Sequence, residues 1–113
     1  MAEKRGKANR EDRVFRMIIV KIHTAEKRKM VSICDKNLIG KKFEEKNFQL
    51  NVLESFYSGQ HLSEKEILKN VRGADSLNIV GEESVKFSLK NNLIEESNII
   101  KIKKIPHTIS ILK

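Results

Sequence analysis

The sequence predicts an α+β fold, in which a small, mostly antiparallel β-sheet has two α-helices inserted between its N-terminal and C-terminal strands. Runs rich in β-branched residues occupy residues 14–22 and 99–112, near the two ends of the chain. Segments with helical features lie between them, at residues 63–72 and 82–91. At 113 residues the chain has room for a single domain.

The N-terminal half predicts strands separated by polar turns. Residues 14–22 are long enough for a central strand, and residues 30–34 form the strand that returns beside it. We expect the polar stretch 23–29 to be a hairpin loop and residues 35–37 to be a turn. Residues 48–53 alternate apolar and polar side chains, so they predict a half-buried strand.

The second half predicts two helices. Ser63 and Glu66 have the spacing of a capping box, in which each side chain bonds the backbone N–H of the other, and Gly73 suits the end of that helix. Residues 74–81 are expected to connect it to the second helix at 82–91, with the final glycine of the connector in a tight approach.

The C-terminal region predicts two more strands, at residues 99–105 and 108–112. We expect the break at Pro106-His107, because proline cannot donate a ladder hydrogen bond and belongs at the start or edge of a strand. The fold therefore closes with strands, as it began.

The composition predicts an intracellular, cytoplasmic protein. Cys34 is the single cysteine, so no internal disulfide can form and nothing indicates an oxidising compartment. The charged start lacks the apolar stretch of a signal peptide, and no run is long enough to cross a bilayer.

Positive charge is concentrated at the two ends of the chain, which has a net charge of +8. Residues 1–29 carry ten Lys and Arg against four acids, and residues 99–113 carry four Lys and no acid. Residues 30–98 carry nine basic residues against eleven acids. This distribution is typical of a polyanion binder, because each cation that neutralises a phosphate releases a counterion.

Three basic clusters are expected to contact RNA. The first is a flexible arm over residues 1–13, with Arg16 just inside the first strand of the domain at 14–113; the others are the predicted hairpin tip and the lysines of the last strands. Their basic residues are Lys4, Arg5, Lys7, Arg10, Arg13, Arg16, Lys27, Arg28, Lys29, Lys101, Lys103 and Lys104. The alternatives are a solubilising tail, an ordinary polar turn, and lysines that protect a sheet edge.

The arrangement of the last cluster depends on strand geometry. We expect Lys101 and Lys103 to share one strand face, with Lys104 opposite unless a bulge intervenes. If the first and last strands are neighbours in the sheet, all three clusters form one basic face.

The aromatic residues predict recognition of RNA by shape and backbone. Four are expected in the core: Phe43, Phe48, Phe56 and Phe87. Phe15 and Tyr57 remain as the rings that could be exposed for stacking. The chain has no ribonucleoprotein motif, zinc-finger spacing or helix-turn-helix pattern, so base-specific reading is not predicted.

Few residues could support catalysis. Cys34, His23, His61 and His107 are the candidate nucleophile, bases or ligands, and their spacing matches no metal motif. His23 and Cys34 flank one hairpin and could approach each other, or Cys34 is a small buried residue and His23 a loop residue. We expect no enzyme, cofactor or metal, and keep a Cys34-dependent enzyme as a third hypothesis.

Several short segments resemble a small archaeal family catalogued as a domain of unknown function, over roughly residues 17–112. The segments are VSICDKNLIGKKFEE, QLNVLESFYSG, LNIVGEESVKFSL and KIPH, and the residues that carry the resemblance are Cys34-Asp35, 38–40, Phe43, Phe56-Tyr57 with Gly59, 79–81 and Pro106-His107. The resemblance implies a component encoded among translation genes, including an initiation-factor subunit, and supplies no catalytic residues. The chain departs from the family in the extension 1–13 and in Lys46-Asn47, where the family's loop is richer in glycine.

Charge and resemblance together predict an RNA-binding archaeal ribosomal or ribosome-associated protein. Its partners would be rRNA and neighbouring ribosomal proteins, with no membrane and no small-molecule substrate. The alternative is an interaction or assembly factor of the translation apparatus that does not bind rRNA directly, with the near-neutral middle of the chain as its interface.

Overall fold

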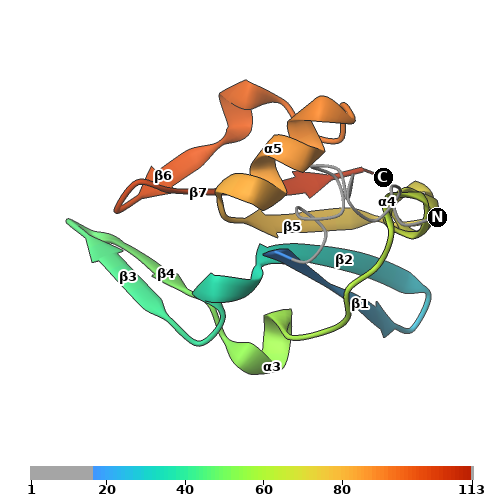
Figure 1. Cartoon of the computed structure of the whole chain (residues 1–113), viewed down its shortest axis with the longest axis horizontal. Coiled ribbons are helices and arrows are strands. Elements are labelled where there is room, and N and C mark those ends of the chain that lie inside the picture. Colours follow the sequence, from blue (N-terminus) through green and yellow to red (C-terminus); the bar gives the residue numbers. More distant parts are fainter. Residues whose placement is uncertain (1–16, 113) are drawn as a thin grey trace, which may run out of the picture.

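The computed structural model describes residues 17–112 and confirms the predicted α+β fold, with a mostly antiparallel sheet (Figure 1). Five strands form one sheet in the order β1-β2-β5-β7-β6, and β3 and β4 form a separate hairpin. The elements are β1 Ile18–Ala25, β2 Arg28–Asp35, β3 Lys42–Glu45, β4 Phe48–Asn51, α3 Glu54–Tyr57, α4 Glu64–Arg72, β5 Ser76–Val80, α5 Glu82–Lys90, β6 Ile100–Ile102 and β7 Ile105–Ile111.

The middle of the sheet is β5, a strand within residues 74–81, which were expected to be a connector. It runs parallel to β2 and antiparallel to β7, so it is hydrogen-bonded on both sides. Leu77 and Ile79 are fully buried, whereas Asn78 between them is half-buried on the opposite face. The connector prediction was wrong because a short strand of alternating apolar and polar residues acquires its stability from neighbours that are distant in sequence.

The first hairpin is longer than its sequence predicts. Pairing between β1 and β2 continues to Ala25 opposite Arg28, so the loop consists of Glu26 and Lys27 alone. The prediction of a loop over residues 23–29 is therefore wrong. Polar residues beyond the core still form cross-strand pairs, and these pairs extend both strands.

The last two strands are separated at a different place from the one predicted. β6 and β7 pair up to Ile102 opposite Ile105, which leaves Lys103 and Lys104 as a two-residue turn. Pro106 is the second residue of β7, close to the strand start where proline is tolerated. The break lies at the two lysines and not at Pro106-His107.

Helix α4 begins with the predicted capping box. The Ser63 side chain accepts a hydrogen bond from the Glu66 N–H at 3.2 Å, and the Glu66 carboxylate accepts from the Ser63 N–H at 3.0 Å. Gly73 is the C-terminal cap, as predicted. Helix α5 covers nearly the whole of the predicted span 82–91.

A carboxylate from another element caps helix α5. The residue before the helix is Gly81, which has no side chain to bond the first backbone N–H groups. The buried Asp35 carboxylate at the end of β2 accepts from the Glu83 N–H at 3.1 Å and from the Ser84 N–H and hydroxyl at 2.8 Å each. Gly81 has φ 110°, and a β-carbon there would collide with Asp35, so the tight approach predicted for this glycine is confirmed.

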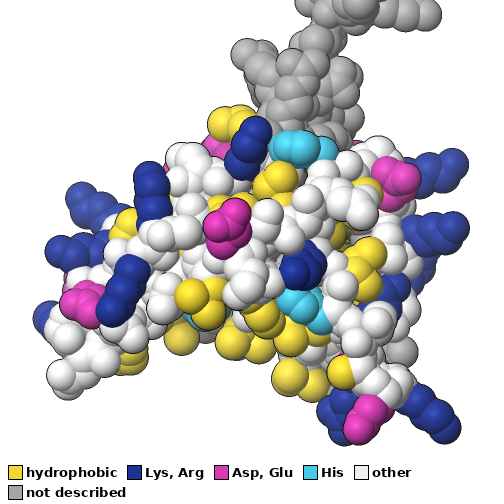
Figure 2. Space-filling view, turned by 90° about the horizontal axis from the view of Figure 1, so that it is seen from below, with side chains coloured by type: hydrophobic (Ala, Val, Ile, Leu, Met, Phe, Trp, Pro, Cys, Tyr) yellow, Lys and Arg dark blue, Asp and Glu magenta, His cyan; other side chains and the backbone are white. Residues whose placement is uncertain are grey.

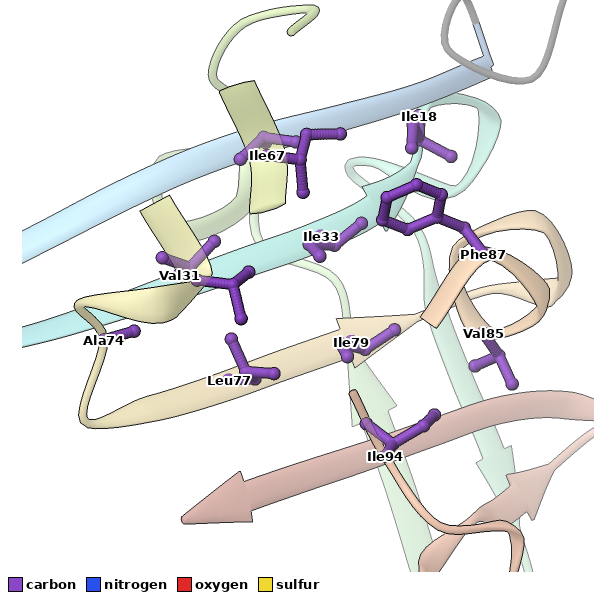
Figure 3. Close-up of a cluster of buried hydrophobic side chains, with 12 residues drawn as sticks. Ile18, Val31, Ile33, Ile67, Ala74, Leu77, Ile79, Val85, Phe87 and Ile94 are labelled. Atoms are coloured by element: carbon purple, nitrogen blue, oxygen red, sulfur yellow. The ribbon is translucent and has the colours of Figure 1, made fainter. Parts of the chain in front are cut away.

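The main core lies between one face of the sheet and helices α4 and α5 (Figure 3). Its buried members alternate along three neighbouring strands and meet side chains from both helices. They include Ile18, Val20, Val31, Ile33, Leu77 and Ile79 from the strands, Ile67 and Val71 from α4, and Val85 and Phe87 from α5. Alternation along the strands directs the remaining side chains of the sheet to its other face.

That other face is covered only in part. The β3–β4 hairpin and α3 pack onto one end of it, where Leu50, Val52 and Tyr57 join a second cluster with buried residues of β2, β5 and β6. Beyond this cover, Ile109 and Ile111 lie on the same face as Asn78 and Ser76, and both are exposed.

Candidate nucleic-acid interface

The described residues carry a modest excess of positive charge. Residues 17–112 contain sixteen Lys and Arg against twelve Asp and Glu. The predicted contacts of the arm, and Arg16 at the start of the expected first strand, lie outside the described residues: Lys4, Arg5, Lys7, Arg10, Arg13 and Arg16. Phe15, one of the two rings expected to be exposed, lies outside them as well.

The two predicted clusters that the structure describes lie at diagonally opposite corners of the sheet. β1 and β6 are its two edge strands, and β7 runs antiparallel to β5, so the β6–β7 turn and the β1–β2 turn point to opposite ends (Figure 1). In Figure 2, Lys and Arg side chains accordingly project from both ends of the molecule. The first and last strands are not neighbours, so these clusters do not share one face.

At the β1–β2 corner, part of the cluster serves the fold. Lys27 and Arg28 are exposed. The Lys29 ammonium donates to the Asn70 side chain at 3.1 Å, and the Lys29 backbone N–H donates to the Asp75 carboxylate at 2.8 Å. Lys29 therefore ties β2 to the end of α4, and Lys27 and Arg28 remain as this corner's outward cations.

At the β6–β7 corner, the backbone of both turn residues is left-handed. Lys103 has φ 53° and Lys104 has φ 67°, so this two-residue hairpin is a type I′ turn. Such turns favour Asn-Gly, because a β-carbon at positive φ costs about 1–2 kcal/mol. The expectation that Lys101 and Lys103 share a strand face is wrong, because the strand ends before Lys103.

A second hairpin tip adjoins this one. The β3–β4 turn begins at Lys46, which also has a left-handed backbone at φ 57°. The Glu45 carboxylate accepts a hydrogen bond from the Lys103 backbone N–H at 2.7 Å, which joins the two turns, and Figure 1 shows the tips side by side. We refer to Glu45, Lys46, Phe48, Lys103 and Lys104 as the twin-turn corner.

Phe48 gives this corner an exposed aromatic ring. It lies directly opposite Glu45 in the β3–β4 register and is 59% exposed. The prediction of a core Phe48 is therefore wrong, and Tyr57, expected to be exposed, is 5% exposed. Burial raises the pKa of Tyr57 to about 12, and its hydroxyl donates to the Asn78 side chain at 2.9 Å.

A groove runs beside the twin-turn corner, between α5 and the last two strands. Its volume is about 610 Å³, and Lys86, Lys101 and Lys104 line it together with Glu82 and Glu96. Lys101 thus faces α5, and Lys104 lies where the groove meets the corner. Because glutamates partly offset the lysines of the groove, the two turns form a more positive surface than the groove does.

Sequence reasoning missed Lys46 and Phe48 as members of a site. The Lys-Asn pair between two strand-like segments is a turn signal, and it could have indicated a basic tip. No local signal indicates that Phe48 is exposed, because its exposure depends on how far along the hairpin the contact with β6 extends.

The candidate catalytic residues are not brought together. Cys34 lies opposite Ile19 and His23 opposite Met30, so the register separates the thiol from the imidazole. Cys34 is fully buried, as predicted, whereas His23, expected in a loop, lies on β1. Burial, and to a lesser extent the charge of Asp35, raises the pKa of Cys34 to about 12. A thiol with that pKa is a poor nucleophile at neutral pH.

Burial disfavours the charged form of two histidines. Burial lowers the pKa of His23, which stacks on Phe56 with ring centroids 4.4 Å apart. Burial also lowers the pKa of His107. The Nε2 atoms of both are buried without a hydrogen-bond partner in the described structure. His61 is exposed on the segment before α4.

Among the described residues, no helix has the length and apolar character that crossing a membrane requires. The described part of the chain is thus an α+β domain with a mixed five-stranded sheet, one helix-covered face and lysine-bearing hairpin tips.

Residues 22–111 match the model of the DUF424 family, described as a protein of unknown function, and the chain belongs to that family. A similar fold occurs in the crystal structure of an uncharacterized conserved protein from Methanopyrus kandleri. The two share 22% sequence identity at a TM-score of 0.69, over 85% of this chain and 93% of that one. No curated protein matches the chain.

Proposed function

We propose that this protein binds RNA as a constituent or accessory protein of the archaeal ribosome, with rRNA and neighbouring ribosomal proteins as its partners. The observation that carries the proposal is the convergence of Lys46, Lys103 and Lys104 at two turns joined through Glu45. All three lysines are exposed, and each occupies a backbone conformation that disfavours its side chain. Three of the five non-glycine residues with positive φ in the described part of the chain lie at this corner, and such gathered strain favours a functional role for them.

The chemistry of the corner suits phosphate rather than base edges. An ammonium group acts as a compact point charge, and each phosphate that it neutralises releases a counterion. The turns lie on adjoining hairpins linked by one hydrogen bond, so they present their charges at a defined spacing to a folded RNA. Residues 1–13 would add further cations that reach between RNA helices.

Sedimentation with ribosomes through cushions of low and high salt tests this function. We expect the protein to pellet with ribosomes at low salt and to be released as the salt rises. The triple variant Lys46→Gln, Lys103→Gln, Lys104→Gln should pellet less. A matched variant, Lys36→Gln, Lys65→Gln, Lys69→Gln, removes the same charge from exposed positions elsewhere and should pellet like the wild type. Protein that stays in the supernatant at low salt contradicts the proposal.

A second function is favoured by a different surface. Ile109 and Ile111 are 58% and 72% exposed on the uncovered sheet face, and Ile100 on β6 is 54% exposed on the same side. In Figure 2, apolar side chains gather between the two projecting ends of the molecule. An exposed apolar patch favours docking of a protein of the translation apparatus without direct rRNA contact.

Two changes separate these functions. Removing residues 1–13 should weaken RNA binding and leave protein docking unchanged. Ile109→Asn should weaken docking and leave the affinity for isolated rRNA unchanged. If the truncated chain binds ribosomes through protein alone, the second function is the correct one.

A further inference from the structure

Phe48 is exposed where its strand would otherwise bury it. On β4 it lies on the same side of the hairpin as Leu50, which is buried, and beyond it Val52 is also buried. The second core cluster thus continues along β4 from Val52 to Leu50 and stops short of Phe48, which is 59% exposed.

Lysines lie at the two turns beside this ring. Lys46 begins the turn that precedes Phe48, and Glu45 directly opposite it is bonded to the turn that carries Lys103 and Lys104. The exposed apolar residues of the uncovered sheet face are Ile100 on β6 and Ile109 and Ile111 on β7. The cores of protein interfaces are depleted of charged residues, so a ring beside lysines is less typical of a protein-docking contact.

A ring beside lysines is the combination that single-stranded nucleic acid recognises. A base stacks on the exposed aromatic face, and adjacent cations neutralise the phosphates on either side of it. Glu45 lies opposite Phe48 and accepts a hydrogen bond from the Lys103 N–H at 2.7 Å, so this one residue links the strand that carries the ring to the second turn.

We propose that Phe48 is a stacking platform for an unpaired base of the bound RNA, with Lys46 and Lys103 on the flanking phosphates. This inference rests on the proposed RNA-binding function and names its ligand as a single-stranded segment, such as a loop or bulge. One ring face accepts any base, so the contact carries little sequence preference.

The chain contains no tryptophan, so Phe48→Trp introduces a single fluorophore at the proposed platform. We expect its fluorescence to be quenched by single-stranded oligoadenylate and much less by an RNA duplex of equal phosphate content. Leu53→Trp is the matched control, because Leu53 is 50% exposed at the opposite end of β4. It should respond equally little to both probes.

An affinity measurement completes the test. Phe48→Leu keeps an apolar side chain but removes the ring, and it should lower the affinity for oligoadenylate by roughly tenfold. Its affinity for an oligomer of the same length with abasic positions should be unchanged, since phosphate contacts remain.

The outcomes distinguish this inference from the function on which it rests. If Phe48→Leu binds oligoadenylate as the wild type does while the triple lysine variant binds poorly, RNA binding stands and the stacking role is wrong. Equal quenching at positions 48 and 53 overturns the stacking role in the same way. If the wild type binds neither probe, the proposed function itself is wrong. If Phe48→Leu loses a protein partner instead, the ring is a docking contact.

Discussion

Asp35 accepts two hydrogen bonds from Ser84, one from its backbone N–H and one from its hydroxyl, each 2.8 Å long. These residues belong to β2 and α5, so a strand supplies the cap that Gly81 cannot supply to the helix. The same carboxylate fills the space beside Gly81, which makes the glycine and the aspartate mutually dependent. Two of the segments that carry the family resemblance, Cys34-Asp35 and residues 79–81, therefore contact each other at the start of α5.

Replacing this carboxylate should destabilise the fold. Asp35→Ala removes the acceptor of three donors at the start of α5, and we expect the free energy of unfolding to fall by about 1–3 kcal/mol. Urea denaturation measures the change. Glu95→Gln, which alters an exposed carboxylate elsewhere, is the control and should change stability by less than about 0.5 kcal/mol. An equal effect of the two changes would contradict the capping role.

Three glycines separate backbone strain from steric exclusion. Gly81→Ala introduces both, because φ is 110° and the new β-carbon meets Asp35, so it should be the most destabilising. Gly40→Ala introduces strain alone, at φ 89° with open space, and should cost about 1 kcal/mol. Gly73→Ala has neither problem and should be neutral or slightly stabilising. Thermal unfolding of the three variants gives the order, and any other order refutes this account.

The lysine turn should show opposite effects on stability and on RNA binding. Replacing Lys103-Lys104 by Asn-Gly supplies the residues that a type I′ turn favours, and should raise the free energy of unfolding by about 1 kcal/mol. The same change removes two cations and should weaken binding to rRNA, with a shallower dependence on salt. Denaturation and binding are measured on the same preparation. If binding is retained in full, the turn does not contact phosphate.

Cys34 should be chemically inert in the folded protein. Burial raises its pKa to about 12, so at neutral pH the thiolate is scarce and the sulfur is inaccessible. A thiol reagent should label the native protein slowly and the denatured protein at once. Cys34→Ser should leave RNA binding unchanged. Rapid labelling of the native state would revive the Cys34-dependent enzyme.

Mild acid should destabilise the fold through its buried imidazole groups. Burial lowers the pKa of His107 in the folded state below its ordinary value of 6.5, so the unfolded chain binds more protons as the pH falls through 6.5. Stability is therefore full above pH 6.5 and is lost as the pH falls toward the lowered folded-state pKa. His107→Gln should reduce this slope in urea denaturation followed across that range. An unchanged slope would place the effect elsewhere, with His23 the next candidate.

The sequence identified elements whose determinants are local. The capping box at Ser63 and Glu66 and the glycine at the end of α4 depend on spacing alone, and both are present. The strand β5 was missed because its stability comes from β2 and β7, which are remote in the chain. The β6–β7 turn was placed at Pro106 because Lys103-Lys104 has none of the residues that predict left-handed backbone.

The candidate site could be predicted only in part. Lys103 and Lys104 were expected to bind RNA from charge alone, and the structure places both at an exposed turn. Their neighbours Lys46 and Phe48 come from a separate hairpin, and the hydrogen bond from the Lys103 N–H to Glu45 that joins them spans distant parts of the chain. Exposure of Phe48 and burial of Tyr57 follow from tertiary packing, which residue type does not report.

The central position of β5 has a consequence for the order of folding. The β1–β2 hairpin can form as soon as those residues leave the ribosome. Strand β5, which pairs with β2 on its other side, becomes available only after the segment 36–75 has been made. Until then the inner edge of β2 is an unpaired template that carries Val31 and Ile33. Such non-local pairing slows folding, and we infer that the nascent chain is most prone to aggregation between the synthesis of β2 and that of β7.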